Sequence, residues 1–240
     1  MGKRIIQQAR GKGSLTYRVK RKAYSIRLQY PGIREGKGKI ISIINSPAHS
    51  CPIAIVKTEN KKFYVVAPSG IIEGQEIDIG KSENPRTGDI LPLKSIPLGT
   101  AICNLEVLPG DGGKLVRTAG TCAKIVKIIP GGISVLMPSK QEKIFNPEVR
   151  ATIGETAAAG RKEKSIVKAG KKWHMMKARN KLWPRTSPIK MNVVDHPFGS
   201  GRGKNMGKSG IAPVGAPPGR KVGLLRPRKT GRGKGSVERR

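Results

Sequence analysis

The apolar residues of this chain gather in short runs between residues 35 and 160, and turn-forming residues separate the runs. The runs are rich in β-branched and aromatic side chains, which favour strands over helices. The polar stretch 58–61 lies between two such runs and suits a hairpin turn. The first set of predicted strands covers 40–46, 53–57, 62–68 and 72–79.

A second set of runs is separated by Gly- and Pro-containing turns at 109–113, 130–132 and 138–140. Turns that recur every 8–12 residues, roughly, are typical of small antiparallel barrels. Helical periodicity is nearly absent, so we expect a mainly β fold with one barrel in 35–84 and another in 85–160. The second set of predicted strands covers 100–108, 114–120, 121–129, 132–137 and 142–146.

The two ends of the chain differ from this centre in composition. Residues 161–240 hold few apolar side chains and many Gly, Pro and basic residues. Such a segment does not bury enough surface to offset the entropy that it loses on ordering. We therefore expect 200–235 to order only on a partner. A short helix is predicted within 168–180.

The charge of the chain is concentrated at the same two ends. The net charge is +33; residues 1–34 carry 10 Lys or Arg and no acid, and residues 161–240 carry 23 bases and 3 acids. A protein with this charge repels itself strongly, which predicts a polyanionic partner. A membrane surface is disfavoured because neither end offers an amphipathic helix with a broad apolar face.

The cysteine content and the N-terminus predict a soluble, cytosolic protein. Three scattered cysteines are too few for a disulfide framework, which fits a reducing compartment. Cys103 and Cys122 are expected to be buried free thiols, and no CxxC or HxxxH spacing indicates a metal site. The N-terminus has no apolar signal region, and Ile6 stands where a myristoylation site requires Ser or Thr.

Two patterns in the C-terminal end are reminiscent of enzymes. Gly207–Ser209 ends like a phosphate-binding loop, but Arg202 occupies the position of the required earlier Gly, and prolines replace the following helix. Asp195 and His196 are adjacent, whereas a catalytic base and its orienting carboxylate usually come from distant positions. The favoured interpretation is that Asp195 caps a turn and His196 makes local contacts, so no catalytic residue is predicted.

Binding to RNA explains more of these features. Glycine lets the backbone approach phosphates closely, while Lys and Arg neutralise them. No DNA-binding motif is present, and long cationic segments suit the irregular grooves of folded RNA. Trp173, Trp183 and Phe198 are isolated aromatic residues in the cationic end. They could stack on unpaired bases, and packing of the two tryptophans over the barrels is an equally good interpretation.

Several blocks of the chain closely resemble the universal family of large-subunit ribosomal proteins conventionally numbered two. One block, 191–203, reads "MNVVDHPFGSGRG", and its Phe198 and Ser200 resemble the archaeal and eukaryotic branch rather than the bacterial "DHPHGGGEG". The resemblance covers nearly the whole chain. The other matching blocks are 11–18, 109–123, 150–155, 168–184 and 216–223.

The resemblance implies an OB-fold followed by an SH3-like barrel, with both terminal extensions threading into large-subunit ribosomal RNA. It also implies a position near the peptidyl-transferase region, with roles in subunit association, tRNA placement and peptide-bond formation. Neighbouring ribosomal proteins and the small subunit would be further partners. No enzyme activity and no cofactor are expected, apart from Mg²⁺ carried by the RNA. The expected domains are 1–34, 35–84, 85–160 and 161–240.

The candidate RNA-binding residues combine the charge pattern with the matching blocks. Two alternatives remain open. A general RNA chaperone or a translation-factor-like binder would use the same barrels but would exchange rapidly, and an enzyme acting on RNA or nucleotides would depend on His196 for turnover. The candidates are Arg10, Lys12, Arg18, Arg21, Arg117, Lys171, Lys172, His174, Lys177, Arg179, Trp183, Asn192, His196, Arg202, Lys204, Lys208, Arg220 and Lys221.

Overall fold

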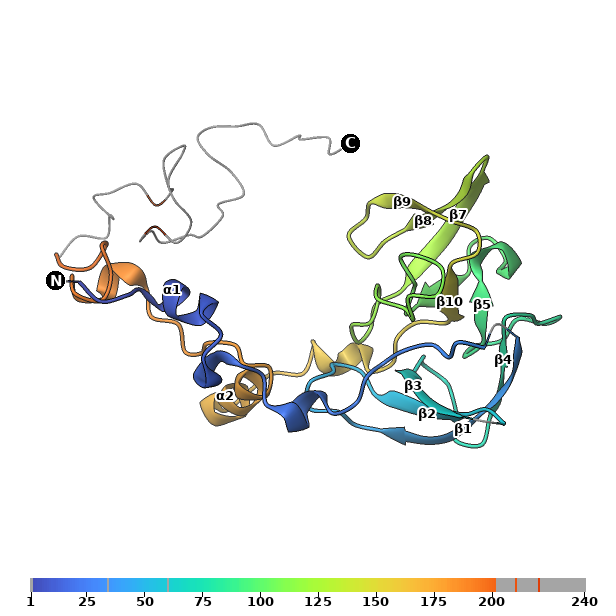
Figure 1. Cartoon of the computed structure of the whole chain (residues 1–240), viewed down its shortest axis with the longest axis horizontal. Helices are drawn as coiled ribbons and strands as arrows, with labels where there is room; N and C mark the ends of the chain where they lie inside the picture. Colours follow the sequence, from blue (N-terminus) through green and yellow to red (C-terminus); the bar gives the residue numbers. More distant parts are fainter. Residues whose placement is uncertain (1, 34, 60, 202–209, 211–219, 221–240) are drawn as a thin grey trace. The chain divides into compact units, whose positions relative to one another are not determined.

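The computed structural model divides into two compact units (Figure 1). One unit joins the two ends of the chain, Met1–Val19 and Asn180–Arg240, and the other comprises Lys20–Arg179. The residues that the structure describes are 2–33, 35–59, 61–201, 210 and 220.

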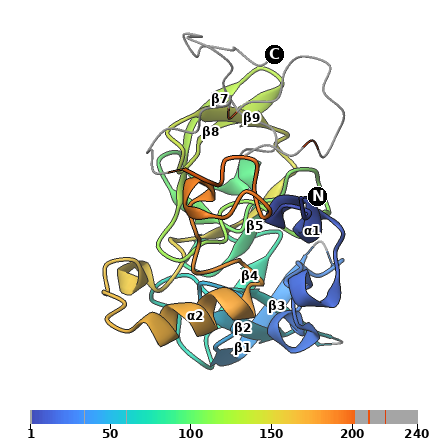
Figure 2. The ribbon, with the colours of Figure 1, turned by 90° about the vertical axis from the view of Figure 1, so that its left-hand side faces the viewer.

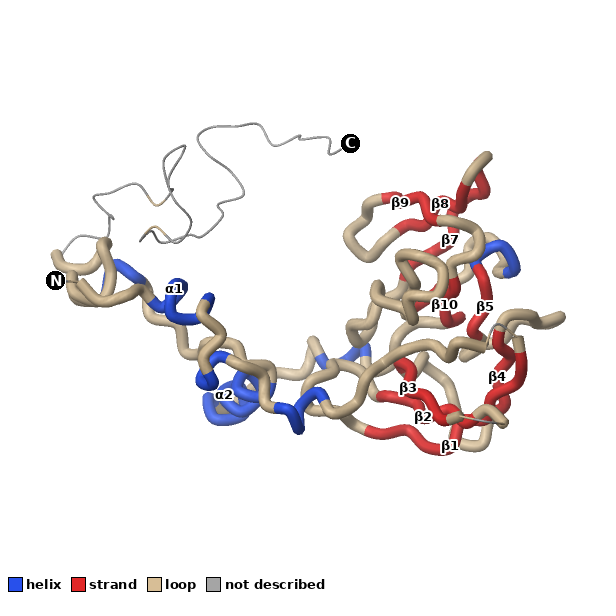
Figure 3. The backbone as a smooth tube through the Cα atoms, in the orientation of Figure 1, coloured by secondary structure: helices blue, strands red, loops and turns tan. Residues whose placement is uncertain are grey.

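All strands of the described residues belong to the unit Lys20–Arg179 and form one sheet, in the order β3-β2-β1-β4-β5-β10-β6-β7-β8-β9 (Figure 3). The mainly β fold is therefore confirmed. The strands are β1 (Gly36–Ile44), β2 (Ile53–Lys57), β3 (Lys62–Val66), β4 (Glu76–Ile79), β5 (Ile90–Pro92), β6 (Ala101–Cys103), β7 (Ala123–Ile129), β8 (Gly132–Leu136), β9 (Glu142–Phe145) and β10 (Arg150–Ile153).

The first four strands enclose a core of their own. β1 pairs antiparallel with both β2 and β4, and its register shifts between Ile40 and Ser42. A β carbon on Gly38 would lie 2.7 Å from Val56 Cγ1, so β1 carries a glycine where β2 packs closest. The core residues are Tyr30, Ile40, Ala54, Val56, Phe63, Val65, Ala67, Ile77, Ile79 and Ile90.

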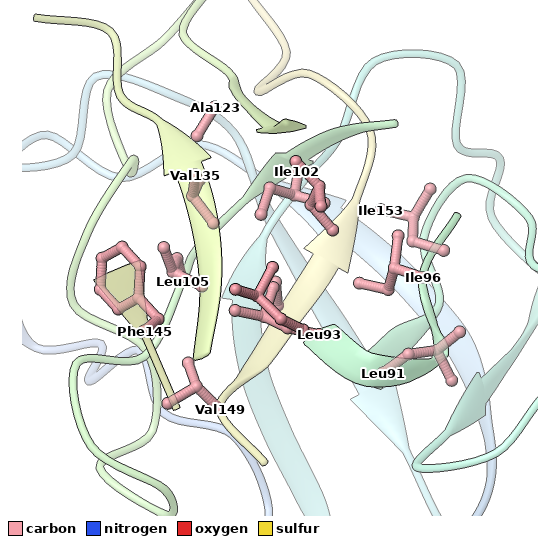
Figure 4. Packing of buried hydrophobic residues seen from close by; sticks show 13 residues of the cluster. Leu91, Leu93, Ile96, Ile102, Leu105, Ala123, Val135, Phe145, Val149 and Ile153 are labelled. Carbon is pink, nitrogen blue, oxygen red and sulfur yellow. The ribbon is translucent and has the colours of Figure 1, made fainter. Parts of the chain in front are cut away.

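Strands β5 to β10 enclose a second core. In the sheet, β7, β8 and β9 lie at the end opposite β1, β2 and β3 (Figure 2). Figure 4 shows aliphatic side chains from several strands converging with Phe145. Each fully buried Leu or Ile contributes roughly 1.5–3 kcal/mol relative to exposure. The core residues are Leu91, Leu93, Ile96, Ile102, Leu105, Ala123, Ile125, Ile133, Val135, Phe145, Val149, Ala151 and Ile153.

A short parallel contact links the two halves of the sheet. Ile79 of β4 pairs with Ile90 of β5, and Pro68 forms an isolated bridge with Thr156. The buried carboxylate of Asp89 accepts hydrogen bonds from the backbone of Asp78, at 2.9 Å, and of Arg86, at 2.7 Å. Both half-cores and the residues between them therefore act as one body.

The expected and observed strands differ in several places, and the predicted runs 72–79 and 100–108 form only the shorter strands β4 and β6. The predicted strand 114–120 is irregular, with one isolated bridge between Leu105 and Leu115, because the preceding loop folds around buried carboxylates. The short strands β5 and β10 were not predicted. Their three or four residues show no alternation because nearly every residue is buried.

The described residues contain two α-helices, α1 (Ile6–Gly11) and α2 (Ala169–Ala178), and none is long and apolar enough to cross a membrane. Helix α2 confirms the helix predicted within 168–180, whereas α1 was not predicted. The expectation that 200–235 orders only on a partner falls almost entirely outside the described residues. Short 3₁₀ helices span Leu15–Tyr17, Arg21–Tyr24, Leu93–Ser95, Ala159–Arg161 and Pro188–Lys190.

Candidate nucleic-acid interface

Helix α2 is an exposed α-helix of the unit Lys20–Arg179. None of its residues is buried, and its first turn contains no acid. Trp173 is 43% exposed and meets the ring of His174 edge to face, with the ring centroids 4.8 Å apart. The helix brings together four of the candidate residues, namely Lys171, Lys172, His174 and Lys177.

A cationic segment, 161–168, leads into this helix, and each of its residues is exposed. Arg161 fixes its beginning, because Nη1 donates to the carbonyl oxygens of Ser50, at 2.6 Å, and of His49, at 3.3 Å. Burial lowers the pKa of His49, and the charges of Arg117 and Arg179 lower it further. His49 is therefore neutral at pH 7, and its Nδ1 lies 2.8 Å from Ser46 Oγ.

Arg117 does not face solvent as an extended side chain. Its Nε donates to Asn104 Oδ1 at 2.7 Å, and Nη2 reaches the carbonyl oxygens of Leu28 and Gly112, each at 3.2 Å, and that of Gly113. Burial lowers the pKa of Arg117. The guanidinium thus stabilises the loop that carries it, a role that the sequence did not indicate, and its contact with RNA stays a prediction.

Residues 20–33, which the sequence analysis assigned to the N-terminal extension, are anchored in the β unit. The buried Tyr30 hydroxyl donates to the carbonyl oxygen of Asn104 at 2.7 Å and lies 2.7 Å from Thr152 Oγ1. Its backbone N–H donates to the carbonyl of Gly112 at 3.1 Å. Desolvation raises the pKa of Tyr30 well above its ordinary value, so the hydroxyl remains a donor at physiological pH.

A buried ion pair organises the loop after β6. Glu106 is fully buried and accepts from the backbone of Gly110, Gly112 and Arg150 and from the Arg150 guanidinium, at 3.1 Å. Arg150 also donates to the carbonyl oxygens of Pro31 and Ile33. The same ion pair therefore holds both the 106–113 loop and the N-terminal segment.

Asp111 closes the tip of this loop. Its carboxylate accepts backbone hydrogen bonds from Val107, Leu108 and Gly113 and pairs with Lys114 at 3.3 Å. Burial raises the pKa of Asp111, but these hydrogen bonds outweigh burial, and the net effect is a lowered pKa. The tight turn is thus stabilised by an ionised carboxylate.

The other unit combines the two ends of the chain. The backbone N–H of Lys3 donates to the carbonyl of Val194 at 2.8 Å, and Lys3 Nζ lies 3.7 Å from Asp195 Oδ1. Ile5, two residues further along, is fully buried. The N-terminus therefore runs directly beside the segment that carries His196.

The 191–200 loop buries His196, which is 3% exposed. The Phe198 N–H donates to His196 Nδ1 at 3.1 Å, so the neutral ring carries its proton on Nε2. Burial lowers the pKa of His196, which favours this neutral form. Nε2 has no hydrogen-bond partner within the described residues. The local contacts expected for His196 are present, whereas Asp195 pairs with Lys3 across the unit.

The remaining candidates fall into two groups. Lys12, Arg18, Asn192 and Arg220 are exposed, Arg10, Arg179 and Trp183 are half-buried, and Arg18 Nε donates to Gly13 O at 2.7 Å. Arg21 begins the 3₁₀ helix Arg21–Tyr24, and its contact with RNA stays a prediction. The candidates outside the described residues, with the 207–209 stretch, are Arg202, Lys204, Lys208 and Lys221.

Comparisons with known proteins identify the family. A family model described as "Ribosomal Proteins L2, C-terminal domain" matches residues 86–215. The "Large ribosomal subunit protein uL2" of Methanococcoides burtonii is 47% identical over 236 residues, which cover 97% of this chain and all of that protein. This chain belongs to the uL2 family. Proteins of the same name from Korarchaeum cryptofilum and Methanocorpusculum labreanum are 42% and 44% identical over at least 96% of either chain. All three are archaeal, which agrees with the archaeal and eukaryotic branch that the "DHPFG" block indicated.

The cysteines of this uL2 family member show a mixed outcome. Cys103 is buried, and desolvation raises its pKa to about 12, as expected for a structural thiol. Cys122 is only half-buried, because it lies at the last position before β7 rather than within the strand. Within the described residues, no three His, Cys, Asp or Glu side chains form a group that could hold a metal ion.

Several residues that organise the interface were missed by sequence reasoning. Glu106 had a signal, namely a lone acid within an apolar run, whereas nothing in the sequence distinguishes Tyr30 from Tyr17 and Tyr24 in the same cationic arm. Lys3, Ile5 and Arg161 had none, since their partners are remote in the sequence.

Proposed function

We propose that this chain binds large-subunit ribosomal RNA through its two cationic ends, with the β unit as the anchoring body. The uL2 family is a structural component of the large subunit of the cytoplasmic ribosome and is not an enzyme. The proposal adds the RNA contact and the residues that make it.

The observation that carries the proposal is the exposure of helix α2. A helix of this length is marginal in water without packing, and no residue of α2 is buried against the described chain. Its Lys171 and Lys177 are exposed and no ion pair within the described residues includes them. A phosphate-rich surface supplies both the missing packing and the counter-charge, and the half-exposed Trp173 can stack on an unpaired base.

The 191–200 loop provides a second, different contact. His196 Nε2 carries a proton and lacks an acceptor within the described residues, and a buried unpaired donor is costly. A phosphate or 2′-hydroxyl oxygen that enters this loop would satisfy it. We therefore assign His196 a hydrogen bond to RNA through Nε2 rather than a charge contact.

The family resemblance supports the finer parts of the proposal. It suggests a position near the peptidyl-transferase region, where the chain would support subunit association, tRNA placement and peptide-bond formation. Neighbouring ribosomal proteins and an intersubunit bridge to the small subunit complete the expected partners. The RNA itself would supply any Mg²⁺.

Chemical footprinting of large-subunit RNA tests the proposal. The full chain is compared with a chain that lacks 161–240, and circular dichroism checks that the β unit remains folded. We expect a footprint that shrinks with the truncation and an affinity that falls roughly 10³–10⁵-fold between 50 and 200 mM salt if about 6–10 phosphates are engaged. An undiminished footprint, or binding that is insensitive to salt, would contradict the mechanism.

A further inference from the structure

The 191–200 loop is a turn held together by its own backbone hydrogen bonds, and these bonds do not attach it to the rest of the chain. Asp195 and His196 N–H groups both donate to the carbonyl of Asn192, and Gly199 N–H donates to the carbonyl of His196 at 2.9 Å. Ser200 N–H donates to the carbonyl of Met191 at 3.1 Å. These bonds make a compact turn, yet none of them fixes the turn to another part of the chain.

The N-terminal segment supplies that attachment. Lys3 N–H bonds the carbonyl of Val194, immediately before the residues that carry the loop's polar side chains. The Lys3–Asp195 ion pair joins the same two segments, and its two side chains are 73% and 46% exposed. Ile5 has an extended backbone, with φ −70° and ψ 157°, and its side chain is fully buried.

The Lys3–Asp195 ion pair and the burial of Ile5 differ in their contribution to stability. An exposed ion pair contributes about 0–1 kcal/mol, and salt screens it. Complete burial of an Ile side chain is worth several times more, because truncation of a buried Ile to Ala typically costs about 2–5 kcal/mol. Burial of Ile5 therefore contributes more than the ion pair to holding the N-terminal segment, and Lys3 sets the register of that segment against Val194 and Asp195.

We propose that Ile5 and Lys3 are positioning residues for His196, so that the N-terminal segment holds the 191–200 loop in place before RNA binds. The proposal deepens the RNA-binding function proposed above and rests on it. Ile5 and Lys3 act through the loop and need not touch RNA. Their loss leaves every candidate RNA-binding side chain in the sequence but misplaces His196.

Amide exchange and imidazole NMR on the full chain test the positioning without RNA. In Ile5→Ala we expect the exchange of the Gly199 and Ser200 amides to accelerate at least about 10-fold, and the Nδ1–Nε2 shift difference of His196 to collapse toward that of a mobile ring. Ile5→Val should give a smaller change of the same sign. Leu15→Ala is the matched control, because Leu15 belongs to the same unit but is 86% exposed, and it should change neither signal.

A charge exchange tests the role of Lys3. Lys3→Glu should accelerate exchange of the Gly199 amide, and the second substitution Asp195→Lys should return the exchange rate to that of wild type. General destabilisation by Lys3→Glu would not be reversed in this way. Unchanged Gly199, Ser200 and His196 signals in both Ile5→Ala and Lys3→Glu would overturn the proposal. RNA titration separates the two hypotheses: if the wild-type chain binds no RNA the proposed function fails, whereas the exchange data still decide the positioning.

Discussion

The hydroxyl of Tyr30 lies 2.7 Å from Thr152 Oγ1 and donates to the Asn104 carbonyl at the same distance, deep inside the β unit. Tyr30 also belongs to the core of the first four strands, while Thr152 and Asn104 belong to the second half of the sheet. One side chain thus ties the N-terminal segment to both halves.

Tyr30→Phe removes this hydroxyl and leaves the ring in place. We expect a loss of about 1–2 kcal/mol in the free energy of unfolding, because a buried carbonyl and a buried hydroxyl lose their partner. Urea denaturation measures the change. Tyr24→Phe is the control, since Tyr24 is 50% exposed, and an equal effect in both variants would refute the special role of Tyr30.

Glu106→Gln should destabilise the β unit by about 3–5 kcal/mol. Arg150, whose side chain is only 12% exposed, would then be buried without its counter-charge. Glu148→Gln breaks an ion pair with Lys94 whose two side chains are more than half exposed, and should change the free energy by no more than about 0.5 kcal/mol. Similar urea midpoints for the two variants would show that the buried pair is not structural.

Asp111 makes the stability of the 106–113 loop depend on pH. Its pKa is lowered from the ordinary 3.8, so its stabilising effect is complete above that value and is lost as the pH falls through the lowered pKa. Asp111→Asn should cost about 1.5–3 kcal/mol at pH 7, and the difference from wild type should shrink toward zero in stronger acid. Urea unfolding from pH 7 to pH 2 measures it, with the exposed Glu83→Gln as the control; a difference that persists undiminished at pH 2 would argue against this role.

Gly113→Ala tests the close packing of the same loop. Gly113 has φ +82°, and a β carbon there would lie 2.6 Å from the Asn104 carbonyl oxygen. Gly74 has a similar φ, +89°, but its β carbon would meet nothing within 4 Å. We expect Gly74→Ala to cost about 1–2 kcal/mol from backbone strain alone and Gly113→Ala clearly more. Equal losses in thermal or urea unfolding would mean that the contact with Asn104 yields easily.

Lys171→Ala should weaken RNA binding through a single phosphate contact. The slope of log affinity against log salt would then become shallower by about 0.7–0.9, the value for one released counterion. Filter binding at several salt concentrations gives the slope. Lys94→Ala removes an equal charge that is already paired with Glu148, so its slope should match that of wild type. A shallower slope in both variants would mean that the loss of net charge, rather than a phosphate contact made by helix α2, weakens binding.

The alternating strands of the centre could be predicted because their signal is local. β2 and β3 lie almost where the apolar runs placed them, and their pairing by a short hairpin follows from the intervening polar residues. β5 and β10 escaped prediction, since a strand of three or four buried residues has no polar face to reveal its period. Helix α2 was predictable from a compact helix-forming stretch, and α1 was not.

The candidate site was only partly predictable, because a local pattern does not show which polar side chains meet partners from remote segments. The sequence identified the exposed bases of α2, but it could not separate them from Arg117, whose guanidinium meets four acceptors inside the protein. The pairing of Lys3 with Val194 joins residues almost 200 positions apart, and no local pattern encodes such a contact.

By itself, then, the sequence determined where the longer alternating strands form and where charge accumulates, and it predicted a polyanionic partner, because these inferences depend on neighbouring residues and on totals. Tertiary structure decided which polar groups lie inside. Tyr30, Glu106 and His196 are buried only because donors and acceptors from remote segments, or in the case of His196 from its own turn, offset the loss of water. The energy of a buried polar group depends on which partners the fold brings to it, and that is settled in three dimensions.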